Sequence, residues 1–230
     1  MDIAGLQKNT LLDYPGKIAC TVFLAGCNLR CPFCHNPSLV LPSRAEPPAM
    51  GEDALLAFLK KRRGLLEGVC ITGGEPTLHR DLPQLIGKIT ALGYPVKLDT
   101  NGTNPKMLGQ LLEAGLLSYV AMDIKNAPEA YANTCGGADV VEQVAESVKI
   151  LRNAGIPYEF RTTVVKPLHS AETMKALGQW LSGEEPYFIQ NFRDTGDLVG
   201  QGLSAFSEDE LKQLLLAVLP YLPNAQVRGN

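Results

Sequence analysis

Strand-like and helix-like segments alternate six times along this chain of 230 residues. Strands that alternate with helices predict a parallel sheet with right-handed crossovers. Six units are too few for a complete eightfold barrel, so we expect an α/β fold, a partial and open (β/α)6 barrel with parallel strands. A flat doubly wound sheet is the competing architecture, because periodicity alone does not separate the two.

The expected strands span 18–24, 68–72, 96–100, 118–124, 157–165 and 187–191. The expected helices span about 52–63, 82–92, 105–114, 140–154, 171–181 and 207–222. Ser207 followed by Glu210 has the spacing of a capping box for the last of these helices. We expect one domain over residues 1–230, with its core at about 16–191 and the C-terminal helix at about 207–222.

Composition narrows the class of protein. Apolar residues make up 45% and charged residues 20%, which is typical of a soluble globular protein. The net charge of −3 gives no electrostatic reason to expect nucleic acid as a partner. We find no signal peptide and no apolar run near the ~18 residues of a membrane span, so we expect a cytoplasmic protein with no membrane partner.

Three cysteines lie together in the sequence C-N-L-R-C-P-F-C: Cys27, Cys31 and Cys34. In a reducing cytosol, clustered cysteines are more often ligands than disulfides. Thiolates with this spacing bind soft metals or iron–sulfur clusters. Three thiolates are one fewer than a [4Fe–4S] cluster needs, which would leave one iron open to a ligand.

The other three cysteines carry weaker signals. Cys20 and Cys70 lie in apolar, strand-like runs, where core packing is the favoured interpretation. Cys135 precedes two glycines in an expected loop and has no role that the sequence identifies.

Polar residues follow the expected strands where each strand ends. In a parallel barrel the loops at the carboxyl ends of the strands build the active site. The residues at these ends, besides the cysteine loop, are Gly73, Gly74 and Glu75; Asp99, Thr100 and Asn101; Asp123 and Lys125; Arg161; and Gln190 with Asn191.

These residue types suit a ligand that joins an amino-acid group to a ribose. The glycine pair allows close backbone approach, and Glu75 can accept a hydrogen bond from an ammonium. Arg161 and Lys125 can neutralise a carboxylate. Asp99 and Asp123 can bind ribose hydroxyls or a hard cation.

The cysteine spacing, with Phe33 before the last cysteine, resembles the signature of the radical S-adenosylmethionine (SAM) superfamily, over about residues 16–191. Gly73-Gly74-Glu75 resembles its motif for the methionine amino group. Residues 5–8, 13–17 and 34–37 are similar to the activating proteins of anaerobic ribonucleoside-triphosphate reductase. Residues 99–102 and 123–125 are similar to pyruvate formate-lyase activating enzyme.

The resemblance implies a radical SAM barrel and a role for each matched residue. Cys27, Cys31 and Cys34 would ligate a [4Fe–4S] cluster whose fourth iron binds SAM. Asp99, Thr100 and Asp123 match the positions of a monovalent cation beside the methionine carboxylate. The full set expected to bind cofactor is Phe33, Gly73, Gly74, Glu75, Asp99, Thr100, Asn101, Asp123, Lys125 and Arg161, with Gln190 and Asn191 near adenine.

The implied activity is that of a radical SAM oxidoreductase. Reductive cleavage of SAM would give a 5′-deoxyadenosyl radical, which takes a hydrogen atom from a glycine of a partner enzyme and leaves a glycyl radical. The implied partner is anaerobic ribonucleoside-triphosphate reductase. The chain has no inserted ferredoxin-like domain, so it would need an external one-electron donor such as flavodoxin or ferredoxin.

Three alternatives stay open. The partner could be another glycyl-radical enzyme of the pyruvate formate-lyase type. The substrate could be a small molecule, as in 7-carboxy-7-deazaguanine synthesis. A structural zinc ion held by the three clustered cysteines and His35 is the most remote.

Overall fold

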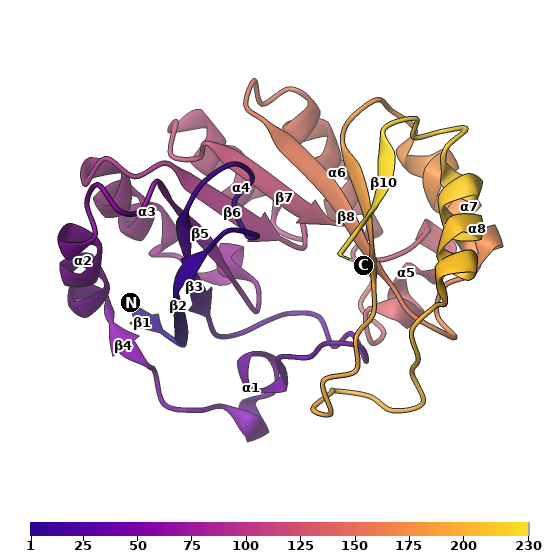
Figure 1. Cartoon of the computed structure of the whole chain (residues 1–230), viewed down its shortest axis with the longest axis horizontal. Helices are drawn as coiled ribbons and strands as arrows, with labels where there is room; N and C mark the ends of the chain where they lie inside the picture. Colours follow the sequence, from indigo (N-terminus) through magenta and orange to yellow (C-terminus); the bar gives the residue numbers. More distant parts are fainter. Residues whose placement is uncertain (230) are drawn as a thin grey trace.

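The computed structural model describes residues 1–229 and is built on a curved eight-stranded sheet (Figure 1). The strand order is β10-β9-β8-β7-β6-β5-β3-β2, and the edge strands β2 and β10 do not pair, so the barrel is open. Six parallel strands correspond to the predicted ones: β3 (Ala19–Leu24), β5 (Gly68–Gly73), β6 (Val96–Thr100), β7 (Tyr119–Asp123), β8 (Tyr158–Val164) and β9 (Tyr187–Asn191). The prediction of a partial parallel barrel is confirmed.

Two strands of this sheet were not predicted. The strand β2 (Gly5–Thr10) pairs antiparallel with β3, and β10 (Ala225–Arg228) pairs parallel with β9. Both are edge strands with several polar residues, so their sequences lack the apolar run that marks a central strand. A further pair of two-residue strands, β1 (Asp2–Ile3) and β4 (Met50–Gly51), lies outside the main sheet.

Six longer helices surround the outer face of the sheet (Figure 1). They are α2 (Glu52–Lys61), α3 (Leu82–Ala91), α4 (Pro105–Glu113), α6 (Val141–Arg152), α7 (Ala171–Leu181) and α8 (Glu208–Val218). Shorter turns are α1 (Pro37–Val40), α5 (Pro128–Thr134) and the 3-10 turns η1 (Pro42–Arg44) and η2 (Pro76–Leu78). The predicted capping box of Ser207 and Glu210 is present, and α8 ends at Val218, before the predicted limit, because the chain turns there to enter β10.

The two faces of the sheet differ in chemistry, because side chains alternate between faces along each strand. On β6, Val96 and Leu98 are buried under the helices, whereas Lys97 and Asp99 belong to the inner face. The inner faces of β7 and β8 carry Asp123, Glu159 and Arg161, among other residues. A parallel barrel that only needs a core fills its interior with apolar side chains, so this polar interior indicates a binding site.

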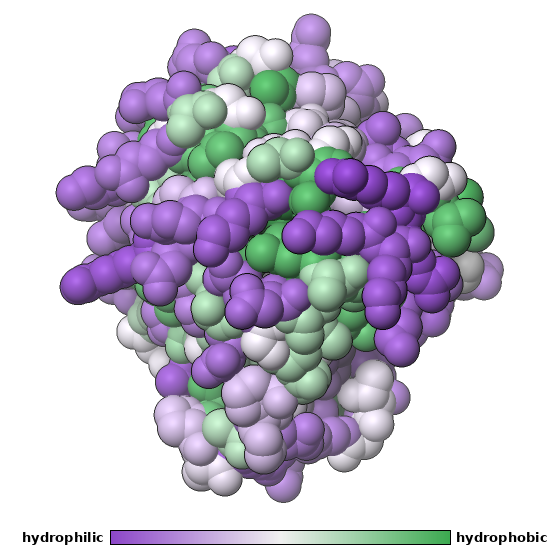
Figure 2. Space-filling model, turned by 90° about the vertical axis from the view of Figure 1, so that its left-hand side faces the viewer, coloured by the Kyte–Doolittle hydropathy of each residue, from purple (hydrophilic) through white to green (hydrophobic). Residues whose placement is uncertain are grey.

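The face of the molecule that carries α2 is largely hydrophilic, with apolar side chains in separate patches (Figure 2). Among residues 1–229, no helix has both the length and the apolar character needed to cross a membrane.

Candidate active site

A cavity of about 250 Å³ opens at the carboxyl ends of the parallel strands. Fourteen of the residues that line it were singled out in the sequence, in the cysteine loop or at the strand ends. These lining residues are Cys27, Cys31, Phe33, Cys34, Gly73, Gly74, Glu75, Asp99, Thr100, Asn101, Asp123, Lys125, Arg161 and Gln190. The structure therefore brings together in one cavity residues that lie far apart in the sequence.

Asn191 is the one predicted site residue that does not line the cavity. Its side-chain amide donates to the backbone carbonyl of Phe206 at 2.7 Å and its side-chain oxygen accepts from the Phe206 N–H at 3.0 Å. Through these two hydrogen bonds, Asn191 holds the segment before α8 against the end of β9. The sequence did not single out Thr72 or Thr163, which also line the cavity, and it gave Asn36 only as part of the motif of residues 34–37.

The three clustered cysteines are free thiols on one side of the cavity. Hydrogen bonds within the loop hold its shape: the Arg30 guanidinium donates to the Cys27 carbonyl at 2.6 Å, and the Cys34 N–H donates to the Cys31 carbonyl at 3.0 Å. The Leu29 N–H also lies 3.4 Å from the Cys27 sulfur, where it stabilises a thiolate. Three thiols facing one cavity with an N–H donor fit an iron–sulfur cluster.

The zinc alternative receives no support from the geometry. Zinc needs its ligands to converge on one ion at about 2.0–2.3 Å. Across residues 1–229, no three His, Cys, Asp or Glu side chains are placed to hold a single metal ion. A cluster instead requires each thiolate to bind a different iron, which does not need such convergence.

Cys135 lies beside the cysteine loop, which the sequence did not indicate. The Arg30 N–H donates to the Cys135 carbonyl at 3.0 Å, and the next residue, Gly136, has a positive φ of 75°. A Cβ at Gly136 would lie 2.5 Å from the Arg30 carbonyl oxygen, so only glycine allows this approach. A hydrogen bond from the Cys135 thiol lowers the pKa of Cys31, while burial raises the pKa of Cys27 and of Cys34.

Gly73 and Gly74, at the end of β5, pack against the segment that leads into the cysteine loop. A Cβ at Gly73 would lie 2.1 Å from the Leu24 carbonyl oxygen, and one at Gly74 would lie 2.0 Å from the Gly26 carbonyl oxygen. These contacts are between backbone segments, so the glycines are required for the loops to fit together as well as for access to a ligand. Any side chain here would displace the loop that carries the cysteines.

Glu75 has a different environment from the one the sequence suggested. Its carboxylate is fully buried, and it accepts hydrogen bonds from the Thr77 N–H and hydroxyl, from the Thr100 hydroxyl and from the Asn101 N–H, at 2.5 to 3.1 Å. Burial raises the pKa of Glu75, and these hydrogen bonds oppose the rise. Because the carboxylate is occupied in this way, the groups of this turn left for a ligand ammonium are its backbone carbonyls.

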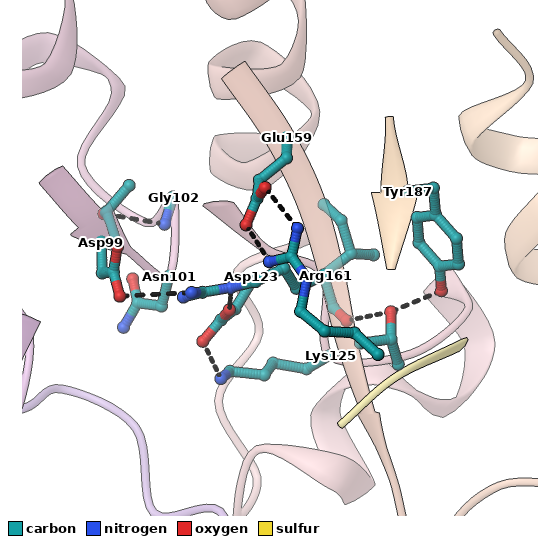
Figure 3. A network of polar contacts seen from close by, with 12 residues as sticks. Asp99, Asn101, Gly102, Asp123, Lys125, Glu159, Arg161 and Tyr187 are labelled. Carbon is teal, nitrogen blue, oxygen red and sulfur yellow. Dashed lines mark hydrogen bonds and ion pairs between the residues drawn. The ribbon is translucent and has the colours of Figure 1, made fainter. Parts of the chain in front are cut away.

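Four charged side chains form a chain across the inner face of the sheet (Figure 3). Arg161 donates to Asp99 at 3.2 Å and to Asp123 at 2.9 Å, and Lys125 donates to the other oxygen of Asp123 at 2.9 Å. Burial alone would raise the pKa of Asp123, but the charges of Arg161 and Lys125 outweigh it and hold that pKa well below its usual range. Asp123 therefore stays ionised and keeps both cationic groups oriented toward the cavity.

A family model described as "Radical SAM superfamily" matches residues 21–181, more than half of the chain. A relative from Methanocaldococcus jannaschii named "Putative glycyl-radical enzyme activating enzyme" is 29% identical over 98% of this chain and 95% of its own length. A 7-carboxy-7-deazaguanine synthase from Thermococcus kodakarensis is 29% identical over 76% of this chain and 74% of its own length.

Solved structures share the fold. A domain of a pyruvate-formate lyase-activating enzyme from Bacteroides vulgatus superposes with a TM-score of 0.57 at 19% identity, over 70% of this chain and 99% of that one. Streptococcus suis SuiB bound to S-adenosylmethionine superposes with a TM-score of 0.68 at 17% identity, over 91% of this chain and 52% of that one.

Proposed function

This chain belongs to the radical SAM superfamily, and on that premise we propose that it is a glycyl-radical enzyme activating enzyme whose partner is anaerobic ribonucleoside-triphosphate reductase. Enzymes of this superfamily use a [4Fe–4S] cluster and SAM. The observation that carries the proposal is the cavity itself, in which three free thiols and the cationic pair Arg161 and Lys125 line the same space.

The cofactors supply the hard chemistry, a one-electron reductive cleavage of the sulfonium that yields a radical able to abstract hydrogen. The protein supplies binding, orientation and exclusion of water. Cys27, Cys31 and Cys34 would hold the cluster. The buried side chains of Leu29, Phe33 and Val40 line the cavity with apolar surface and would help to exclude water around a bound cluster.

The charged chain would select the amino-acid end of SAM. Arg161 and Lys125 have their charges fixed by Asp123, and both can attract the methionine carboxylate. Gly73 and Gly74 line the same cavity, and the backbone carbonyls of their turn would accept hydrogen bonds from the methionine ammonium. Gln190, on β9, would lie toward the adenine.

The likeness to activating enzymes supports the choice of a glycyl-radical enzyme as partner. The M. jannaschii relative matches nearly the whole chain, which favours a glycyl-radical enzyme as substrate. We place the reaction in the cytoplasm, with flavodoxin or ferredoxin as the external electron donor. The motifs of residues 5–8, 13–17 and 34–37 favour the ribonucleotide reductase over pyruvate formate-lyase.

The test combines the anaerobically purified chain, SAM, a reductant and the candidate reductase. A glycyl-radical signal in electron paramagnetic resonance is the expected result. The control omits SAM. Cleavage of SAM without any radical on the reductase would contradict the choice of partner.

A second candidate is 7-carboxy-7-deazaguanine synthesis, since the T. kodakarensis relative matches three quarters of the chain. Incubation with the candidate small-molecule substrate separates the two functions. Turnover of that substrate, without a glycyl radical on any reductase, would support the second candidate.

A further inference from the structure

Lys97 is a buried lysine at the inner face of the barrel, with only 1% of its side chain exposed. It lies two residues before Asp99 on β6, so both side chains point to the same face of the sheet. The Lys97 ammonium donates to Oδ1 of Asp99 and lies 3.9 Å from the Cys70 sulfur. Nothing in the sequence motifs pointed to Lys97.

With Lys97 in place, every carboxylate oxygen of the expected cation site already has a cationic donor. Asp99 accepts from Lys97 at one oxygen and from Arg161 at the other. Asp123 accepts from Arg161 at one oxygen and from Lys125 at the other.

Thr100, the third residue of the expected cation site, is also engaged. Its hydroxyl donates to the Glu75 carboxylate at 2.7 Å and accepts from the Gly102 N–H at 3.1 Å. The side chains that resemble a monovalent-cation site are therefore bonded to groups of the protein itself. The residues present do not fit a bound cation.

The net charge of these side chains also argues against a bound cation. Among the five side chains of these ion pairs, Lys97, Arg161 and Lys125 contribute three positive charges and the two aspartates two negative ones, so the group carries a net charge of +1. The Glu75 carboxylate stands outside this group, because its hydrogen bonds come from Thr77, Thr100 and Asn101. Glu159, the next acidic group on this face, is paired with Arg228 at 2.6 Å. One positive charge suits one carboxylate of a ligand, whereas an added Na⁺ or K⁺ would be repelled by ammonium and guanidinium groups on the same oxygens.

We propose that the Lys97 ammonium takes the place of a monovalent cation in this chain, so that binding of SAM does not depend on Na⁺ or K⁺. This inference rests on the proposed function, because it takes the ligand carboxylate to be that of SAM. Lys97 is a positioning residue: it fixes Asp99, and Asp99 in turn orients Arg161 toward the ligand. The chain thereby replaces an exchangeable ion by a covalently attached charge.

Thallium(I), a K⁺ analogue with strong anomalous scattering, tests the site directly. In crystals soaked in thallium(I) acetate, we expect no anomalous peak between Asp99 and Asp123 of the wild-type protein. The Lys97→Met variant, which leaves Asp99 without its ammonium in a similar volume, is expected to show such a peak. Lys106→Met, at an exposed lysine of α4, is the control and should behave as wild type.

Affinity for SAM gives the second readout, measured in tetramethylammonium buffer with K⁺ added at constant ionic strength. For the wild type we expect a change in Kd of less than about twofold. For Lys97→Met we expect Kd to rise about tenfold, equivalent to about 1.4 kcal/mol, and to recover on addition of K⁺. If Lys97→Met does not fold, the same measurements are made on Lys97→Gln. The wild-type results need no variant, so they still support or overturn the proposal.

A thallium peak in the wild type, K⁺-dependent SAM binding by the wild type, or a Lys97 variant that K⁺ does not rescue would each overturn the proposal. The thallium result requires neither cluster nor SAM. A wild-type protein that binds no SAM would therefore count against the proposed function, while the thallium peaks would still decide the role of Lys97.

Discussion

The Glu75 carboxylate accepts a hydrogen bond of 2.6 Å from the backbone N–H of Asn101, and so joins the loop after β5 to the loop after β6. The same carboxylate also accepts from Thr100, the residue before Asn101. Two loops of the cavity are thus held together by one buried group. These hydrogen bonds give Glu75 a structural role at the centre of the site.

Replacing Glu75 by Gln is expected to destabilise the protein. The amide puts an N–H₂ group where an oxygen now accepts, which leaves a buried donor without a partner at a cost of about 1–3 kcal/mol. Anaerobic urea unfolding followed by circular dichroism measures the loss. Thr100→Ser keeps the hydroxyl and is the matched control; a Glu75→Gln midpoint equal to that of the wild type would show that these hydrogen bonds contribute nothing.

Much of the fold could be predicted because the central strands are apolar and the helix ends carry caps. The bounds of β6 and β9 agree with the prediction, and the capping box of Ser207 and Glu210 is confirmed. The edge strands β2 and β10 were missed because their stability depends on neighbouring strands rather than on their own sequence.

The site could be predicted as a set of residues more readily than as a set of contacts. Spacing placed the cysteines and the strand-end residues on one rim, where the cavity is found. The engagement of Glu75, the pairing of Lys97 with Asp99 and the contact of Cys135 with the cysteine loop depend on how separate strands align. No local pattern in the sequence encodes such alignments.

Replacing Cys31 by Ala is expected to abolish cluster assembly while the barrel stays folded. Two remaining thiolates cannot hold a cluster that three thiolates bind. Iron and sulfide analysis with the absorption at about 400 nm measures this. Cys20→Ala, at a core cysteine of β3 outside the cavity, should retain the cluster; a full cluster in Cys31→Ala would disprove the ligand assignment.

Replacing Arg161 by Lys is expected to weaken SAM binding about tenfold, or about 1.4 kcal/mol. Lysine keeps the charge, but its single ammonium lacks the planar fork that donates to both Asp99 and Asp123. Equilibrium binding of SAM measures the loss. Arg152→Lys, in the ion pair with Glu185 on the outside of the molecule, is the control and should change affinity little. Wild-type affinity in Arg161→Lys would mean that the fork is not needed.

Stability is expected to fall on acidification through the range in which histidine titrates. His169 is buried, and its Nδ1 accepts from the Val165 N–H at 3.1 Å while Nε2 donates to the Lys125 carbonyl at 2.9 Å. Burial lowers the pKa of His169, so the unfolded chain binds the proton more readily than the folded one. The stabilisation is complete above the unfolded pKa of about 6.5 and is lost as the pH falls toward the folded value.

The free energy of unfolding, measured between pH 7.5 and 5, checks this prediction. The slope should be positive in the wild type, and each such group contributes at most about 1.4 kcal/mol per pH unit to it. His169→Gln should show a shallower slope. His35 and Cys31, whose pKa values are also lowered, contribute to the slope that remains. A variant whose slope is as steep as that of the wild type would contradict the assignment to His169.

The most direct measurement is the metal content and SAM cleavage of the anaerobically prepared protein. The account predicts about four irons per chain, absorption near 400 nm and, after reduction, conversion of SAM to methionine and 5′-deoxyadenosine. Zinc in place of iron, or a reduced cluster that leaves SAM intact, would contradict it.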